Sequence, residues 1–112
     1  MKVIRGAVCA ENSVESISQN AVLLVKEILQ ANNLSAQKVE AVIFSATRDL
    51  DACYPATAVR TQLLPNASFM CFQEMFVPNS LPKVLRVGVF AEMDGEPKHC
   101  YLGETRNLRN LK

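Results

Sequence analysis

The sequence predicts an α+β fold in which one mixed β-sheet carries helices on a single face. The 112 residues are a usual length for one domain, and 49% of them are hydrophobic, which is enough for a core. The segments follow in the order strand, helix, strand, helix, strand, strand, strand. Two helices are too few to cover both faces of such a sheet, so we expect a symmetric oligomer to cover the second face.

The first half of the chain predicts two strands around one long helix. Residues 3–8 form a short apolar strand that Gly6 breaks. Asn12 is the expected N-cap of the helix, and residues 39–45 form a buried strand after it. The helix runs to about residue 31, because apolar residues recur on one face: Ile17, Ala21, Leu24 and Ile28.

The second half of the chain predicts one short helix and three strands. Pro55 suits the first turn of a helix that extends to about residue 64. We expect strands over 68–75, 84–93 and 99–102, separated by turns rich in Pro, Asn and Gly. The C-terminal tail, 103–112, is polar, and we expect it to be mobile unless something holds it. The chain, 1–112, is expected to form a single domain.

Composition excludes several classes of function. The 12 Lys and Arg balance 11 Asp and Glu to a net charge of +1, which gives no indication of nucleic acid, a membrane surface or a polyanion as partner. No apolar run approaches the length of a membrane span. The four cysteines have no CxxC spacing, so neither a zinc knuckle nor a redox pair is expected: Cys9, Cys53, Cys71 and Cys100. We expect a cytoplasmic protein with reduced thiols.

The sequence contains no familiar motif for a nucleophile, a metal or a cofactor. It has no Walker loop, GxGxxG, HExxH or GxSxG. Asp49 and Asp51 are candidate metal ligands, but no histidine or third carboxylate stands near them, so loop solvation is the better interpretation. His99 is the only histidine, and without a marked partner acid or nucleophile we assign it a surface or strand-end role.

Charged residues inside apolar segments are the unusual feature of this sequence. Arg5, Arg60 and Arg86 all stand among apolar residues, and Glu74 ends the apolar run twelve residues before Arg86. Burying a charge is costly unless a partner compensates it, so Arg86 and Glu74 either pair with each other or await a ligand. Unrelated ion pairs or snorkelling side chains are the alternative. Several arginines in one small neutral domain favour an anion site, and the planar guanidinium suits a small polycarboxylate.

The chain resembles the AroH-class chorismate mutases, the trimeric type found in Bacillus. The resemblance covers 3 to about 109, in five blocks that recur in order: 4–8 (IRGAV), 44–60 (FSATRDLDACYPATAVR), 70–75 (MCFQEM), 85–87 (LRV) and 101–102 (YL). It implies a trimeric pseudo-α/β-barrel with sites in clefts between neighbouring subunits. It also implies the conversion of chorismate to prephenate, toward phenylalanine and tyrosine, by an intramolecular Claisen rearrangement that uses no cofactor and no metal.

The resemblance assigns four catalytic positions. Arg86 falls on the arginine that hydrogen-bonds the ether oxygen and a substrate carboxylate. Arg5 falls on an arginine that clamps a carboxylate. Glu74 matches the carboxylate that accepts from the substrate hydroxyl and orients an arginine, and Cys71 matches a cysteine that also approaches the hydroxyl. In an ideal strand two residues three apart lie on opposite faces, so we predict a bulge or twist between residues 71 and 75.

The resemblance also assigns the substrate-binding positions. Tyr101 matches a tyrosine that contacts a carboxylate, and Arg60 an arginine near the cleft mouth. The other matching positions close the cleft, either from the neighbouring subunit or from the tail: Tyr54, Ala56, Thr57, Leu108 and Arg109. Two residues depart from the family pattern, because Tyr54 replaces Phe and Thr57 replaces Lys. The lost basic group predicts either weaker substrate affinity or compensation by arginines of the tail.

Two other classes of function compete with the enzyme. One is a non-catalytic trimeric carboxylate-binding module of the same fold, and the other is a purely structural trimer with intersubunit ion pairs. A binder needs carboxylate clamps but no group aimed at the ether oxygen. A structural trimer needs a protein carboxylate for every interior arginine, and the apolar segments offer only Glu74. The presence of Arg86 together with Glu74, Arg5 and Tyr101 therefore favours catalysis.

Overall fold

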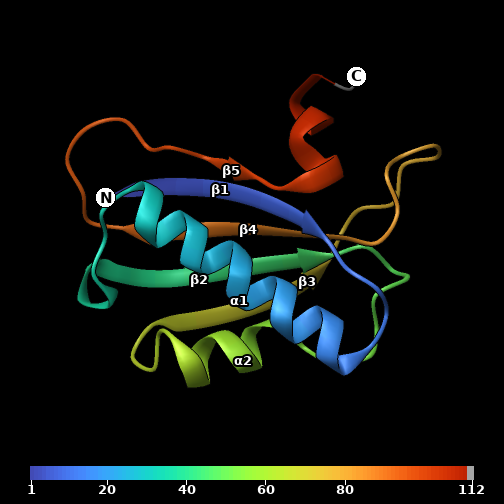
Figure 1. Cartoon of the computed structure of the whole chain (residues 1–112), viewed down its shortest axis with the longest axis horizontal. Helices are drawn as coiled ribbons and strands as arrows, with labels where there is room; N and C mark the ends of the chain where they lie inside the picture. The colour runs from blue at the N-terminus through green and yellow to red at the C-terminus, as the bar shows by residue number, and fades with distance from the viewer. Residues whose placement is uncertain (111–112) are drawn as a thin grey trace.

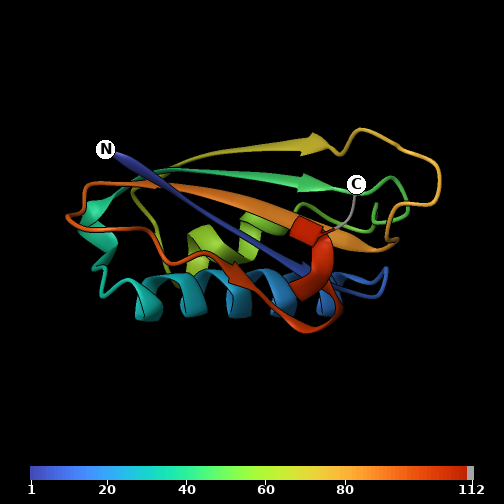
Figure 2. The same ribbon diagram turned by 90° about the horizontal axis from the view of Figure 1, so that it is seen from above.

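One five-stranded mixed sheet with both α-helices on the same face forms the body of the protein (Figures 1 and 2). The structure, a computed structural model, describes residues 1–110 and the side chains of residues 1–106. The strands are β1 (Lys2–Cys9), β2 (Val39–Ala46), β3 (Ser68–Gln73), β4 (Val84–Ala91) and β5 (Cys100–Tyr101), in the order β3-β2-β4-β1-β5. The helices are α1 (Val14–Ala31) and α2 (Pro55–Gln62), with short 3-10 helices η1 (Ala36–Lys38) and η2 (Gly103–Asn110). The predicted α+β fold is confirmed.

Strand directions make the sheet mixed. β4 lies at its centre and is antiparallel to both β1 and β2, whereas β3 is parallel to β2 and β5 is parallel to β1. The pairing has one shift of register, in β2 between Val39 and Ala41. Pairing of β1 with β4 runs without interruption past Gly6, which lies opposite Val87, so the predicted break at this glycine was wrong.

Gly6 instead marks the place where helix and strand approach most closely. A Cβ atom at this position would lie 2.7 Å from the carbonyl oxygen of Cys100 and 3.0 Å from side-chain atoms of Ile28 and Leu24. No real Cβ tolerates the first of these distances, and a backbone oxygen held in the sheet cannot move away cheaply. The glycine is therefore needed for packing α1 onto β1, and not for bending the strand.

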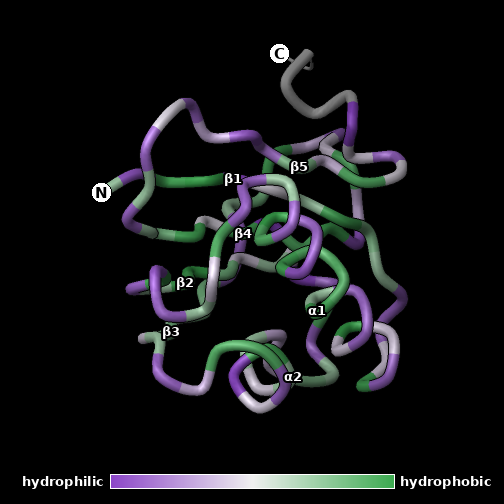
Figure 3. Tube along the Cα trace, turned by 60° about the vertical axis from the view of Figure 1, so that its left-hand side comes forward, coloured by the Kyte–Doolittle hydropathy of each residue, from purple (hydrophilic) through white to green (hydrophobic). Residues whose placement is uncertain are grey.

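The core lies between the sheet and the two helices. Residues on the inner face of the strands, such as Ile4, Phe44 and Val89, are fully buried. They pack in one cluster with α1, whose predicted apolar face is confirmed by its buried residues: Ile17, Ala21, Leu24 and Ile28 among them. Hydrophobic stretches follow the strands, whereas hydrophilic residues predominate in the connections (Figure 3). Neither helix of residues 1–110 is long and apolar enough to cross a membrane.

The start of α1 differs by one residue from the prediction. Ser13, and not Asn12, is the N-cap: its side chain accepts a hydrogen bond from the backbone N–H of Ser16 at 3.1 Å. Asn12 instead reaches the loop that follows β2. Its Oδ1 accepts from the backbone N–H groups of Asp51 and Ala52, each at 3.0 Å, and its Nδ2 donates to Asp51. Asn12 thus fastens the loop over 47–54 to the beginning of the helix.

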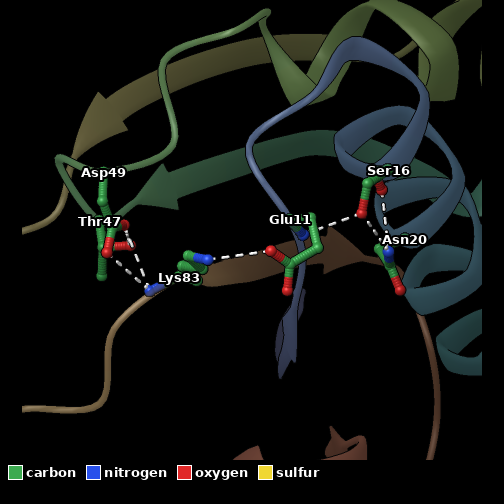
Figure 4. Close-up of polar contacts among 6 residues, drawn as sticks. All are labelled: Glu11, Ser16, Asn20, Thr47, Asp49 and Lys83. Carbon is green, nitrogen blue, oxygen red and sulfur yellow. Dashed lines mark hydrogen bonds and ion pairs between the residues drawn. The ribbon is translucent and has the colours of Figure 1, made fainter.

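The turn before β4 is held by a polar network (Figure 4). Lys83 has a φ of 56°, a left-handed conformation that is strained for a residue with a side chain. Its backbone N–H donates to the Asp49 carboxylate at 3.1 and 3.2 Å, and its Nζ pairs with Glu11 at 2.9 Å. The contact with Glu11 raises the pKa of Lys83. The network ties together the three chain segments that meet at this end of the sheet.

The polar tail begins with an anchored turn. η2 lies beside the end of β1 (Figure 1), and Thr105 within it is completely buried. The Thr105 hydroxyl lies 2.9 Å from the carbonyl oxygen of Ala7 and 2.6 Å from that of Leu102. Something therefore does hold the first part of the segment expected to be mobile. The side chains of Leu108 and Arg109 lie outside the described part of the chain.

Within residues 1–110 neither α-helix covers the outer face of the sheet, as the two-helix prediction implied. Figure 2 shows both helices below the sheet and none above it. Large apolar side chains on this open face are exposed: Val3, Met70 and Phe72. The loop after β3 adds three more: Met75, Phe76 and Val77. Exposed apolar side chains gathered in one region indicate a surface for another molecule.

Candidate active site

Arg86, Glu74 and Ser45 meet on the open face of the sheet. Ser45 in β2 lies directly opposite Arg86 in β4, and Glu74 directly follows the end of β3. The Arg86 Nε lies 3.1 Å from Glu74 Oε2, and the Ser45 hydroxyl donates to Glu74 Oε1 at 2.5 Å. The two charged residues that stood out in the sequence therefore pair with each other, and Ser45 fixes the carboxylate from the other side.

The pairing of Arg86 with Glu74 leaves the arginine able to bind a ligand. The Nε atom is buried, yet its N–H forms no hydrogen bond. The contact with Glu74 is therefore an ion pair in which the N–H of Arg86 Nε does not point at Glu74 Oε2. The Arg86 side chain remains 43% exposed, whereas that of Glu74 is 25% exposed. Glu74 compensates the charge of Arg86, while part of the guanidinium faces the open side of the sheet.

Arg5 and Tyr101 share this face of the sheet with Arg86. In the register of β1, Arg5 lies opposite Gly88, and Ala7 lies between Arg86 on β4 and Tyr101 on β5. Side chains of directly paired residues point to the same face, so Tyr101, Arg5 and Arg86 all stand on the open side. A shallow hollow of about 290 Å³ contains Arg5 and Arg86. Two cations on adjacent strands suit a ligand with two negative charges.

Cys71 lies on the other face of the sheet. The pairing of β3 with β2 is continuous from Ser68 to Gln73, and the N–H of Glu74 continues it to the carbonyl oxygen of Ala46 at 2.8 Å. The irregularity predicted between residues 71 and 75 was therefore wrong, and ordinary alternation puts Cys71 with the core and Glu74 outside. Burial raises the pKa of the Cys71 thiol, and a hydrogen bond to the backbone of Ala56 lowers it in part.

Cys71 belongs to a second group of predicted residues, at the edge formed by β3 and α2. Cys71 and Tyr54 line a cleft of about 450 Å³ beside the loop over 47–54. Ala56 is buried in the first turn of α2, whereas Thr57 and Arg60 are exposed on the same helix. The structure thus separates the predicted residues of the open face from those at the edge of β3 and α2, of which Tyr54 and Cys71 line the cleft.

Sequence reasoning missed two residues near these groups. Ser45 was overlooked although alternation along β2 puts it on the face of Ile43, opposite Arg86 once the strands are paired. Arg48 was overlooked because the polar loop was interpreted only as solvated. Its guanidinium lies over the ring of Phe76, 3.8 Å from the ring centre, and its side chain lines the Tyr54 cleft. Only the strand order and the loop path reveal either position.

The residues considered for metal or acid–base chemistry have structural contacts. Asp49 accepts from the backbone of Lys83, and Asp51 accepts from Asn12. The Nδ1 atom of His99 accepts a hydrogen bond from the backbone N–H of Arg5 at 2.9 Å, which is the strand-end role predicted for it. Within the described residues no three histidine, cysteine or acidic side chains gather in a way that would hold a metal ion.

The fold and the site together define a small α+β protein with two arginines on the open face of its sheet, an arrangement suited to an anionic ligand. Comparison with known protein sequences identifies the family within this broad class. The profile of the family described as chorismate mutase type I matches residues 1–111, and the chain belongs to that family. The resemblance seen in the sequence blocks is confirmed.

Individual relatives agree with the family match. The chain is 36% identical over 111 residues to the chorismate mutase AroH of Thermus thermophilus, covering 95% of this chain and 91% of the relative. It is 35% identical over 114 residues to the chorismate mutase AroH of Bacillus subtilis, covering 95% and 87%. The solved structure of a chorismate mutase from Clostridium thermocellum superposes with a TM-score of 0.91 at 34% identity, covering 95% of this chain and 98% of that one.

Proposed function

We propose that this chain is a chorismate mutase that converts chorismate to prephenate in the synthesis of phenylalanine and tyrosine, in the cytoplasm. The observation that carries the proposal is the position of Arg86 beside Arg5 on the open sheet face, with its charge balanced by Glu74 at 3.1 Å. The reaction is an isomerisation within one molecule. The protein therefore has to hold the substrate folded and stabilise the charge that develops, without supplying a nucleophile.

Arg86 stabilises the breaking bond in this proposal. As the carbon–oxygen bond of the ether breaks and the new carbon–carbon bond forms, negative charge grows on the ether oxygen. A fixed guanidinium stabilises that charge more strongly in the transition state than in the ground state, which lowers the barrier. Glu74 and Ser45 hold the cation in place, and Arg5 and Tyr101 bind the carboxylates. Because the orientation is built before substrate arrives, little reorganisation is needed during the reaction.

The two groups of residues become one site only between subunits. Arg5, Arg86 and Glu74 stand on the open face, whereas Tyr54 and Cys71 line a cleft at the β3 edge of the same chain. We propose a homotrimer in which the cleft residues of one subunit close over the open face of the next. The side of the subunit that carries the cleft supplies Ala56, Thr57 and Arg60 as well, whereas Leu108 and Arg109 have side chains outside the described residues.

Chorismate absorbs in the ultraviolet, and its decay on addition of purified protein tests the proposal. The variants are Arg86→Ala and Arg86→Lys, checked for folding by circular dichroism. Loss of a donor of this kind lowers the rate by about 10²–10³, and a lysine restores little because one point charge cannot replace the planar fork. Absence of decay with folded, trimeric wild-type protein would instead favour the non-catalytic binding module. Variants that lose stability but keep turnover would favour the structural trimer.

A further inference from the structure

The cleft at the β3 edge contains one positive charge, and it belongs to Arg48. Tyr54, Pro55 and Cys71 form its apolar side, and the cleft has a volume of about 450 Å³. Among the residues that line it within the described part of the chain, Arg48 is the only basic one and Asp51 the only acidic one. Asp51 accepts a hydrogen bond from Asn12 at 2.9 Å, and no ion pair within the described residues joins it to Arg48.

Stacking holds Arg48 without using its hydrogen-bonding capacity. The guanidinium carbon lies 3.8 Å from the centre of the Phe76 ring. Phe76 lines a second hollow, of about 300 Å³, which shares Thr47 and Arg48 with the cleft and also contains Asp49 and Glu74, so Arg48 stands where the two hollows meet. Within the described residues Arg48 has no ion pair with a carboxylate. Contact with a ring uses the face of the guanidinium, and its N–H donors all lie in the plane of the group. A positioned fork with free donors at the wall of a cleft is suited to a carboxylate.

We propose that Arg48 binds a carboxylate of the substrate from the cleft side of the site, as a binding residue to which the family resemblance assigned no role. This inference rests on the proposed function and deepens it. Thr57 in α2 carries no charge and is exposed, and it is absent from the lining of this cleft. Arg48 therefore supplies a positive charge to a half-site in which the family resemblance leads us to expect a lysine at position 57.

Steady-state kinetics of Arg48→Ala test the role. A charge-assisted hydrogen bond contributes enough to ground-state and transition-state binding alike for its loss to raise KM about tenfold or more. The value of kcat should change less than about twofold, because this interaction is uniform and not confined to the transition state. Arg48→Lys, which keeps the charge but loses the fork and the stacking, should be intermediate. In the Arg48→Ala background, Thr57→Lys should recover a large part of the affinity.

Lys26→Ala is the matched control, because it removes one exposed cation from the outer side of α1 and should leave both constants unchanged. Equilibrium binding of the dicarboxylate prephenate to wild type and Arg48→Ala gives a readout that needs no turnover. Weaker binding by the variant supports the inference even if wild type fails to turn chorismate over, a result that would overturn only the proposed function. A KM and a prephenate affinity equal to those of wild type in folded Arg48→Ala would overturn the inference.

Discussion

Ser45 shows how much of the site depends on one hydroxyl group. Its donation to Glu74 Oε1 at 2.5 Å restrains a carboxylate that otherwise has rotational freedom beside Arg86. The neighbour across the strands is Arg86 itself, so Ser45 stands between the two charged partners. It touches Glu74 and not, in our proposal, the reacting atoms. Its role is therefore to position the residue that positions Arg86.

Ser45→Ala should lower kcat about tenfold, which corresponds to losing roughly 1.4 kcal/mol of transition-state stabilisation. Since substrate carboxylates bind elsewhere, KM should change little. Ser45→Thr is the matched control, because it keeps the hydroxyl and adds a methyl group that strands accept well. Steady-state assays of chorismate decay give kcat and KM for wild type, Ser45→Ala and Ser45→Thr. Equal kcat values for Ser45→Ala and wild type would show that Glu74 needs no support from β2.

At the level of single residues, the sequence predicted the sheet face of a side chain better than the residues with which that side chain shares a site. Alternation predicts Arg86 on one face with Val84, Gly88 and Phe90. Arg86, Gly88 and Phe90 do line one hollow, whereas Val84 is buried and does not line it. The expected bulge near Cys71 failed for a physical reason. The prediction assumed that Cys71 and Glu74 face one cleft, whereas regular alternation leaves them on opposite faces and avoids the cost of a distorted ladder.

The loop over 47–54 is the element that connects the helix layer to the cleft. Asn12 accepts from two consecutive backbone N–H groups of this loop and donates to Asp51. The side chain of Ser13, the next residue, accepts from the backbone N–H of Ser16 in the first turn of α1, and the Ser13 backbone N–H donates to Glu11, so neither bond reaches the loop. Adjacent residues thus have separable roles, one for the loop and one for the helix.

Asn12→Ala should raise KM for chorismate about fivefold. The loop that carries Arg48 and Tyr54 loses its three hydrogen bonds between Asn12 and residues 51 and 52, so both side chains are held less firmly for the substrate. Ser13→Ala should leave the kinetics unchanged and lower the free energy of unfolding by about 1 kcal/mol, the usual cost of losing an N-cap. Kinetics and urea unfolding at equal protein concentration separate the two effects. If both variants changed only stability, the loop would be positioned by its own packing and not by Asn12.

Element types followed closely from sequence, and element ends did not. The apolar spacing of α1 predicted its extent to Ala31, and the missed N-cap reflects two adjacent residues of nearly equal capping tendency. β3 and β4 end two residues earlier than predicted, at Gln73 and Ala91, because Met75 and Met93 suggested longer strands although a glutamate precedes each methionine. The short contact of β1 with β5 depends on register across 94 residues, which no local pattern contains.

At the scale of the whole molecule, the open face of the sheet carries apolar side chains that are exposed to solvent in the described residues of a single chain. Phe72 on that face is 52% exposed, and Leu23 on the outer side of α1 is 46% exposed. The two side chains therefore have similar exposed fractions but lie on different sides of the molecule. Phe72 shares its face of the sheet with two other exposed apolar side chains, Val3 and Met70. If the open face is buried between subunits, a charge at Phe72 is desolvated, whereas a charge at Leu23 stays in water.

Phe72→Asp should therefore dissociate the trimer at micromolar concentration and abolish turnover, because the cleft of a neighbour then no longer reaches Arg86. Leu23→Asp should remain trimeric and active. Sedimentation velocity gives the state of assembly, and chorismate decay gives the activity.

A site shared between subunits predicts a further result. Refolding the inactive variants Arg86→Ala and Tyr54→Ala together should restore part of the turnover, since mixed trimers contain interfaces with both halves intact. A monomeric wild type that turns over chorismate, or no recovery in trimers shown to be mixed, would place the complete site within one chain.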